Sequence, residues 1–293
     1  MSTPIDFAAP RSALYMPASS TKLLAKGPTL AADAIIVDLE DSVAPEAKRD
    51  ARIAAVQALT SLDYGARLRV LRVNAEDTEW HQDDIAAAVA SVPDAVLLPK
   101  ADNGAQISRF VERIDAAGLA RDVAVWAMLE SPTAVIAAPS IAEAGEKHSR
   151  FTTVCVGNND LSLAAGMAVP ASRDLLQSWL LSFVAAARAG GLAILDGVYN
   201  NYRDVEGYLA DCAASAELGM DGRTLIHPLQ IDGAHQVFSP DARAIEEARV
   251  LVDAFADPAN AGSGVLSING RMFERLHLTL AHKTLARARR LTT

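Results

Sequence analysis

Acidic side chains follow two apolar segments that are consecutive along the chain. Glu130 ends the segment 124–130 (AVWAMLE), and Asp160 ends the next one, 151–160 (FTTVCVGNND). Both segments have the length and composition of buried parallel strands, whose carboxyl ends meet at one rim. Two carboxylates at one rim suit Mg²⁺, which prefers oxygen ligands and keeps part of its water shell. Each acid alone could equally be a helix cap or a first-turn residue, but the pair favours a metal site.

Arg72 lies inside a third apolar segment, and a charged group in a buried strand needs a partner. Asp38, Glu40 and Asp41 end a fourth segment, where three acids within four residues repel one another unless cations neutralise them. We expect Arg72 to pair with Glu40 or Asp41, and its guanidinium could also grip a substrate carboxylate with two hydrogen bonds. The acids could instead support metal-bound water, or they could lie in a solvated loop.

Lys100, Asn74 and His227 also follow apolar segments. Lys100 could form a Schiff base with a carbonyl substrate, which is the strongest rival chemistry among these residues. His227 could act as a base, but a histidine before a proline in a loop is more often structural. The sequence contains no Gly-rich phosphate loop, no Cys/His metal-binding spacing and no G-x-S-x-G nucleophile motif.

Eight short apolar segments must position these residues, and amphipathic helical patterns fill the gaps between them. The segments are 12–17, 34–41, 68–74, 95–100, 124–130, 151–160, 192–200 and 223–228. This order predicts an α/β protein with a (β/α)8 TIM barrel, in which catalytic groups lie at the carboxyl ends of the strands. We expect residues 1–238 to form this barrel.

The remaining residues, 239–293, predict a C-terminal helical extension. Residues 239–257 have the pattern of a helix, residues 258–264 (PANAGSG) that of a flexible linker, and residues 271–290 that of a terminal helix. This segment is too small for an independent domain. We expect it to cap its own barrel or that of a neighbouring subunit.

Composition limits the functional class of this chain of 293 residues. It is 51% hydrophobic and carries a formal net charge of −9, which argues against nucleic acid as a partner because phosphate binding needs clustered cations. The two cysteines, Cys155 and Cys212, are expected to be buried free thiols in a reducing compartment. No apolar run reaches membrane length, so we expect a soluble cytoplasmic protein that does not bind membranes.

A set of short motifs in fixed order resembles the citrate lyase β-subunit-like family of the HpcH/HpaI aldolase superfamily. This family includes malyl-CoA, β-methylmalyl-CoA and citramalyl-CoA lyases. The motifs are RSALYMPASSTKLLAK, DLEDSVAPEAKRDAR, LRVN, LPK, MLES, GNNDL, DGVYNNYRD and LGMDGRTLIHPLQI. The resemblance runs from about Arg11 to the C-terminus, and the order and combination of the motifs make it specific.

The resemblance implies a (β/α)8 barrel with Mg²⁺ held by Glu130 and Asp160. It implies that Arg72 binds the keto acid or hydroxy acid part of the substrate. It also implies that Glu40 and Asp41 support the site. The implied reaction is cleavage or formation of the C–C bond of a 3-carboxy-3-hydroxyacyl-CoA thioester through a thioester enolate. The alternatives are a malyl-CoA-type thioesterase and a citrate lyase β-like subunit that acts on an acyl-carrier partner or only binds the acyl group.

Further implications concern the coenzyme and the tail. Arg11 and Lys22 are expected on the CoA side of the site. Family members are trimers or hexamers, and their C-terminal segment covers a neighbouring subunit's site. Lyase members often carry G-x-M-[IV]-D there, with the aspartate as the acid or base, whereas this chain reads GRMFE and ends that motif in Glu274. Glu274 is therefore the expected catalytic acid or base, with Arg275 and His277 as possible substitutes.

Overall fold

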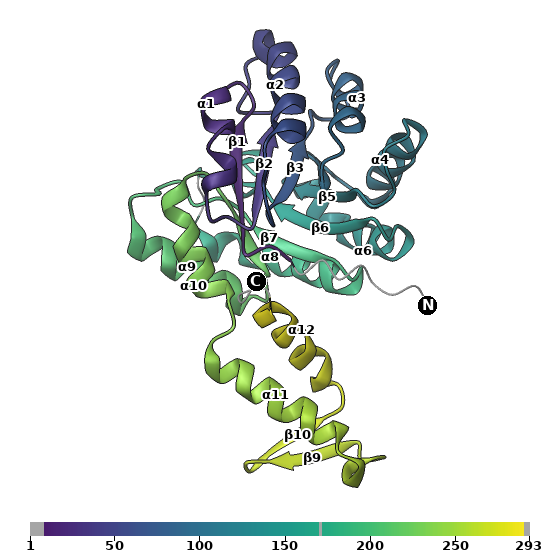
Figure 1. Ribbon diagram of the computed structural model, residues 1–293, viewed down its shortest axis with the longest axis vertical. Coiled ribbons are helices and arrows are strands. Elements are labelled where there is room, and N and C mark those ends of the chain that lie inside the picture. The colour runs from purple at the N-terminus through teal and green to yellow at the C-terminus, as the bar shows by residue number, and fades with distance from the viewer. Residues whose placement is uncertain (1–8, 170–171, 290–293) are drawn as a thin grey trace. The chain divides into compact units, whose positions relative to one another are not determined.

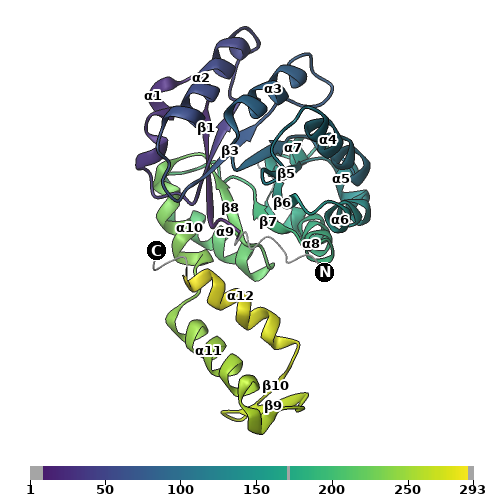
Figure 2. The same ribbon diagram turned by 45° about the vertical axis from the view of Figure 1, so that its right-hand side comes forward.

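Eight parallel strands close into a barrel in the computed structural model, which describes residues 9–169 and 172–289. Each strand pairs with the next along the chain, and β1 pairs with β8, which confirms the predicted TIM barrel. Figures 1 and 2 show the helices that surround it. The strands are β1 (Ser12–Pro17), β2 (Ala34–Asp38), β3 (Leu68–Arg72), β4 (Ala95–Leu98), β5 (Ala124–Leu129), β6 (Phe151–Val156), β7 (Ala193–Asp196) and β8 (Gly222–Leu225).

Alternate residues of these strands fill the barrel interior, while the others face the helices. One interior cluster joins Ile36, Leu97, Trp126 and Met128, all at most 3% exposed. Because both faces are buried, the strands read as continuous apolar runs, and this made them recognisable in the sequence. The polar residues that end the strands therefore lie at one rim.

Helices connect successive strands, and side-chain caps fix where several of them begin. Asn103, Ser131 and Asp204 each accept a hydrogen bond from a backbone N–H of the first turn of α4, α5 and α9. The helices of this part are α1 (Thr21–Leu24), η1 (Gly27–Thr29), η2 (Pro45–Ala47), α2 (Lys48–Ser61), α3 (His81–Ser91), α4 (Gly104–Ala116), α5 (Pro132–Ile136), α6 (Ala138–Lys147), α7 (Asn158–Ala164), α8 (Arg173–Ala189), α9 (Val205–Glu217), η3 (Pro228–Gln230) and α10 (Ile231–Phe238).

The chain divides into two compact units, one ending at His235 and one beginning at Gln236. The second contains α11 (Ala242–Ala256), η4 (Pro258–Asn260), β9 (Val265–Ile268), β10 (Arg271–Glu274) and α12 (His277–Arg289). Helices α11 and α12 pack on each other around Leu251, Phe255 and Ala281. The two strands form an antiparallel hairpin.

The prediction of a terminal helix from Arg271 is wrong at its start, because residues 271–274 form a strand and the helix begins at His277. The physical reason lies in the preceding turn. Asn269 and Gly270 both take positive φ angles, of 52° and 77°. An Asn-Gly pair between two short segments favours a two-residue hairpin turn, and this signal was overlooked.

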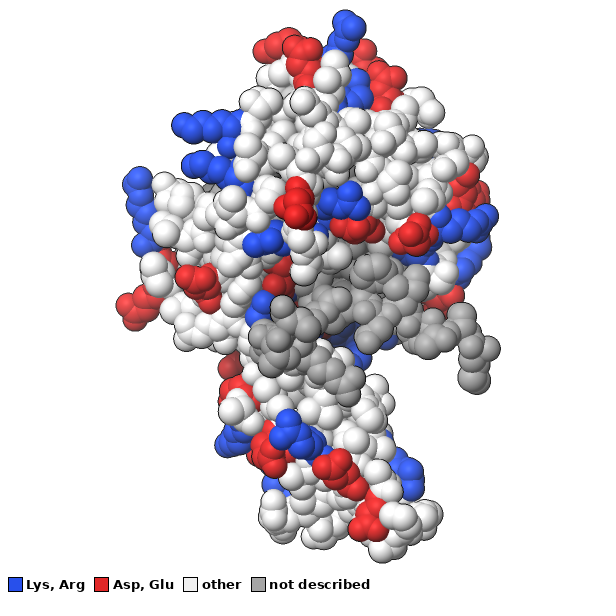
Figure 3. Space-filling model, in the orientation of Figure 1, with Lys and Arg blue, Asp and Glu red and all other residues white. Residues whose placement is uncertain are grey.

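Cys155 and Cys212 are buried and free, as predicted. No helix among residues 9–169 and 172–289 is long and apolar enough to cross a membrane. Figure 3 shows acidic and basic side chains interspersed over the face in view.

Candidate metal and substrate site

A cavity of ≈ 330 Å³, called the first cavity here, opens at the carboxyl ends of the barrel strands. Its lining includes Tyr15, Asp41, Arg72, Glu130 and Asp160, which come from five different β-strands or the loops and helices that follow them. The fold therefore brings together the acids and the arginine that the sequence indicated. Topology is the cause, since parallel strands end at one rim.

Arg72 is 7% exposed and is held by three acids. Its Nε and Nη2 donate to the two oxygens of Asp38 at 2.6 and 2.7 Å. Its Nη1 pairs with Glu40 at 2.9 Å and more distantly with Asp41 at 3.4 Å. The guanidinium also lies 4.9 Å from the centre of the Tyr15 ring. The two parallel hydrogen bonds to Asp38 fix the Nε–Nη2 edge of the guanidinium, and Nη1 is the nitrogen that remains for contacts in the first cavity.

Burial disfavours the charged forms of Asp38 and Arg72, whereas the attraction between their opposite charges favours them. Burial alone would raise the pKa of Asp38, but Arg72 outweighs it and holds that pKa below its usual range. Burial likewise disfavours the charged form of Arg72, yet Asp38 raises its pKa well above the ordinary value. Both groups are therefore charged.

Lys100 connects Glu40 with Glu130. Its Nζ lies 2.8 Å from an oxygen of Glu40, and its backbone N–H donates to Glu130 Oε1 at 2.7 Å. This places Lys100 at a φ of 51°, which is costly for a residue with a Cβ atom. Burial lowers the pKa of Lys100, but Glu40 more than compensates and raises it. A protonated, paired ammonium does not suit a Schiff-base nucleophile, so the structure disfavours that alternative.

Glu130 has a strongly raised pKa in the first cavity. Burial raises its pKa to about 8, with further contributions from Glu40 and Asp160. Its Oε2 atom is buried and has no hydrogen-bond partner among the described residues. A Cβ atom added to Gly157 would lie 2.5 Å from Glu130 Cβ and would also clash with Oε2. Glycine at this position therefore lets the carboxylate sit against the turn after β6.

The donor set of the first cavity fits Mg²⁺. Asp160 lies in the first turn of α7 and lines the same cavity as Glu130. No cluster of three or more metal-ligating side chains occurs in the described parts of the chain. Two carboxylates with water as the remaining ligands are a common arrangement for Mg²⁺. Asp160 also satisfies the alternative interpretation as a first-turn acid, and the two are compatible.

Lys48 is a site residue that sequence reasoning missed. It is 6% exposed, and its Nζ donates to Leu39 O and Glu40 O at 2.8 Å and to Asn74 Oδ1 at 2.6 Å. Asn74 in turn donates to Asp84 at 2.6 Å. This network holds the turn that presents Glu40. One feature of the sequence could have indicated Lys48. It is the first residue of a helix, where the helix dipole disfavours a cation, so a lysine there needs nearby acceptors.

Arg11 lies away from the first cavity, which argues against the expectation that it lies on the CoA side. Arg11 precedes β1, so it lies at the amino end of the barrel, opposite the first cavity. There its Nε and Nη2 donate to Asp33 at 2.8 and 2.7 Å. Lys22 lies exposed in α1, which follows the carboxyl end of β1, and its role stays a prediction.

His227 and Glu274 take different places. His227 stacks on Tyr202 at 4.1 Å and accepts a hydrogen bond from the backbone of Leu229, which supports the structural interpretation. Glu274 lies exposed at the end of β10, and its backbone N–H donates to His277 Nδ1 at 2.9 Å. A catalytic role for Glu274 stays a prediction.

Comparisons with known proteins agree on one family. The family model described as HpcH/HpaI aldolase/citrate lyase matches residues 11–228. The chain is 41% identical over 278 residues to a (3S)-malyl-CoA thioesterase of Cereibacter sphaeroides (strain ATCC 17025 / ATH 2.4.3), covering 95% of this chain and 94% of the relative. It is 34% identical over 286 residues to citrate lyase subunit beta of Escherichia coli (strain K12), covering 95% and 93%.

Solved structures give the same result. The crystal structure of CitE from Mycobacterium tuberculosis with magnesium, acetoacetate and coenzyme A matches with a TM-score of 0.74 and 29% identity, covering 96% of this chain and 98% of that one. A citrate lyase beta subunit from the same organism, with oxaloacetate and magnesium, matches with a TM-score of 0.67 and 30% identity, covering 80% and 98%.

Proposed function

The chain belongs to the HpcH/HpaI aldolase/citrate lyase family, and from this premise we propose a specific reaction. The chain is a Mg²⁺-dependent enzyme that cleaves, or in reverse forms, the C–C bond of a malyl-CoA-type thioester. The single observation that carries this proposal is the buried, unpartnered oxygen of Glu130 beside Asp160, in the same cavity as Arg72. A structural neighbour that binds magnesium, a keto acid and coenzyme A supports it.

Glu130 and Asp160 hold the metal. When bound, Mg²⁺ supplies positive charge that acidifies a hydroxyl and polarises the carbonyl of the keto acid. Arg72 binds the carboxylate of the hydroxy acid through Nη1, because Nε and Nη2 are committed to Asp38. The long contact between Nη1 and Asp41, at 3.4 Å, is the one that the substrate replaces.

Proton transfers complete the reaction. A carboxylate takes the hydroxyl proton, the C–C bond breaks, and its electron pair forms a thioester enolate. Burial raises the pKa of Glu40, which suits a carboxylate that accepts a proton during a reaction. Glu274 then donates the proton that converts the enolate into the acetyl or propionyl thioester. Lys22, exposed near the mouth of the barrel, contacts the CoA moiety.

Thioester hydrolysis is the second candidate. Four relatives that are 41–42% identical over 95% of the chain are named (3S)-malyl-CoA thioesterase. The same groups would hold the acid part of the thioester, and water would attack its carbonyl. Glu274, one methylene longer than the family aspartate, could shift the balance between the two reactions. The similarity to citrate lyase β subunits keeps an acyl-carrier thioester as a further substrate form.

One assay separates these reactions. The protein is incubated with Mg²⁺ and malyl-, methylmalyl- or citramalyl-CoA, and keto acid and free thiol are followed separately. Keto acid together with acetyl- or propionyl-CoA indicates C–C cleavage, whereas free CoA without keto acid indicates hydrolysis. Turnover only of carrier-bound thioesters indicates the citrate lyase β role. Glu130→Ala should abolish Mg²⁺-dependent turnover, while Glu112→Ala, at an exposed position of α4, should not change it.

We further propose that the chain forms trimers or hexamers in which the C-terminal segment covers a neighbour's site. The second unit exposes apolar side chains at Met272, Leu276 and Leu280, each at least 65% exposed. Mixing the inactive variants Glu274→Ala and Arg72→Ala should then restore activity, because some sites receive both intact residues. No recovery after subunit exchange, verified by native mass spectrometry, would contradict catalysis by Glu274 across an interface.

A further inference from the structure

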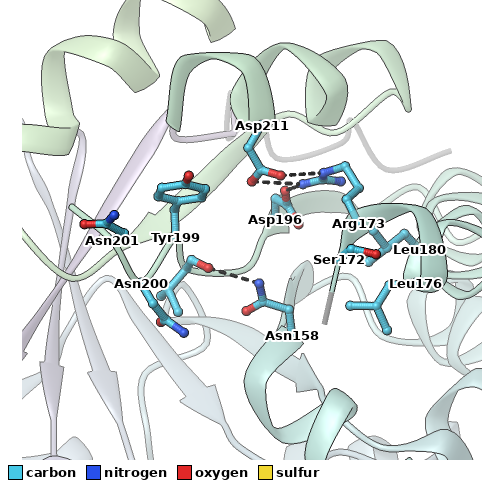
Figure 4. A pocket seen from close by; sticks show the side chains of 11 residues that line it. Asn158, Ser172, Arg173, Leu176, Leu180, Asp196, Tyr199, Asn200, Asn201 and Asp211 are labelled. Atoms are coloured by element: carbon cyan, nitrogen blue, oxygen red, sulfur yellow. Dashed lines mark hydrogen bonds and ion pairs between the residues drawn. The ribbon is translucent and has the colours of Figure 1, made fainter. Parts of the chain in front are cut away.

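A second cavity of ≈ 320 Å³ adjoins the first and is not used by the proposed reaction. It lies between α8, the end of β7 and the loop after β7 (Figure 4). Asn158 and Val198 line both cavities. The Asn158 side chain donates to Val198 O at 3.0 Å, and Asn159 and Asn200 exchange amide hydrogen bonds at 3.1 and 2.9 Å. These amide groups lie where the two cavities meet.

The charged side of the second cavity is electrically balanced. Arg173 pairs with Asp211 at 2.9 Å and with Asp196, as Figure 4 shows. Arg223, which is fully buried, pairs with Asp196 at 2.9 Å and with Asp211. Two cations thus face two carboxylates. An additional anion would have no net positive charge to bind, so the cavity suits an uncharged group.

Two buried polar atoms of residues that line the second cavity have no hydrogen-bond partner among the described residues. They are Arg173 Nη1, a donor, and Asn158 Oδ1, an acceptor. Leu176 and Leu180, at 3% and 2% exposed, supply an apolar part of the cavity wall. Buried polar atoms normally find partners. The lining therefore matches a mainly apolar group that carries at most one neutral hydrogen-bonding function.

We propose, on the basis of the function proposed above, that the second cavity receives a substituent on the hydroxyl-bearing carbon of the substrate. Asn158 follows Gly157, against which Glu130 packs, and it precedes Asp160 by two residues. The part of the substrate nearest the amide groups is therefore its hydroxy acid half. The second cavity is almost as large as the first, so the substituent is uncharged, mainly apolar and larger than a methyl group.

Filling the cavity tests this assignment. Thioesters with hydrogen, methyl or propyl on the hydroxyl-bearing carbon are compared in the wild type, in Leu180→Phe and in Leu176→Phe. The matched control is Leu181→Phe, because Leu181 neighbours Leu180 in α8 but is 45% exposed. We expect the filled variants to lower kcat/KM for the propyl thioester relative to the unsubstituted one by roughly tenfold or more. The control should leave this ratio unchanged.

A binding measurement makes the test independent of turnover. The affinities of glyoxylate and 2-oxopentanoate are measured by calorimetry with Mg²⁺ in the same variants, after their melting temperatures confirm folding. Selective weakening of 2-oxopentanoate in the filled variants supports the assignment, even if no thioester is turned over and the proposed function fails. The assignment is refuted if the wild type rejects the propyl compounds as strongly as the filled variants do.

Discussion

Gly157→Ala should disable the metal site without unfolding the barrel. An alanine Cβ here would lie 2.5 Å from the Cβ atom of Glu130, where ordinary contacts begin at 3.4 Å. The shortfall is about 0.9 Å, and rotation of the Glu130 side chain cannot relieve it because a Cβ atom moves only with its backbone. Gly157 itself has a φ of −100°, so no backbone strain confuses the result.

The expected loss follows from this displacement. A misplacement of about 1 Å in a catalytic group costs ~10²-fold in rate. We therefore expect Gly157→Ala to reduce Mg²⁺-dependent kcat/KM by about 10²-fold, because Glu130, the proposed metal ligand, moves relative to Asp160. Calorimetric titration with Mg²⁺ should show weakened binding, and circular dichroism should show an intact fold.

Gly264→Ala is the matched control, since a Cβ atom there meets no atom within 4 Å and the backbone is not left-handed. It should retain wild-type Mg²⁺ affinity. The reasoning fails if Gly157→Ala binds Mg²⁺ and turns over substrate as the wild type does. The close packing of Glu130 on the turn after β6 would then be unrelated to metal binding.

Four further outcomes follow from the geometry. Burial would raise the pKa of Asp33, but hydrogen bonds from Arg11 and His235 hold this pKa well below its usual range. The ionised Asp33 side chain therefore contributes about 2 kcal/mol to the free energy of unfolding above pH ~4, and this contribution is lost as the pH falls further. In urea titrations, Asp33→Asn should therefore be less stable than the wild type at pH 7, with the difference shrinking as the pH falls below ~4. Lys48→Met should lower the free energy of unfolding by about 3 kcal/mol, because it leaves buried carbonyls unpaired, whereas a methionine at the exposed Lys147 should have no effect. The free energy of unfolding should be about 1 kcal/mol higher for Lys100→Gly than for Lys100→Ala, because glycine adopts a φ of 51° without strain and alanine does not. Equal stabilities of the two variants would contradict this. Glyoxylate should bind detectably in calorimetry only when Mg²⁺ is present, and equal affinity in a chelator would refute a metal-dependent site.

The barrel could be predicted because its strands are buried on both faces and therefore read as apolar runs. The same rule placed Glu130 and Asp160 at one rim, since neighbouring parallel strands end together. The hairpin of the second unit escaped because its strands are short and partly exposed, so their composition resembles that of a surface helix. Only the Asn269–Gly270 turn distinguished the two structures.

Side-chain partners were harder to predict than strand ends. Glu40 and Asp41 were the expected partners of Arg72, yet Asp38 holds it most tightly. The reason is register, since Asp38 and Arg72 lie directly opposite each other where β2 pairs with β3. Register depends on how the strands align, which a single sequence does not specify. The position of Arg11 also followed from topology, because a residue before a strand lies at the opposite end of the barrel.

Charge balance at the first cavity supports the proposed metal site. Five carboxylates line it or pair with its arginine, namely Asp38, Glu40, Asp41, Glu130 and Asp160. Among the described residues, Arg72 and Lys100 are the cations that form ion pairs within this group, so ionisation of all five carboxylates would leave an excess of three negative charges. Neighbouring negative charges, together with burial, raise the pKa of Glu130, and they would repel a substrate carboxylate. A divalent cation at Glu130 and Asp160 would offset most of this negative charge. The proposed site would then favour an anion that binds together with Mg²⁺.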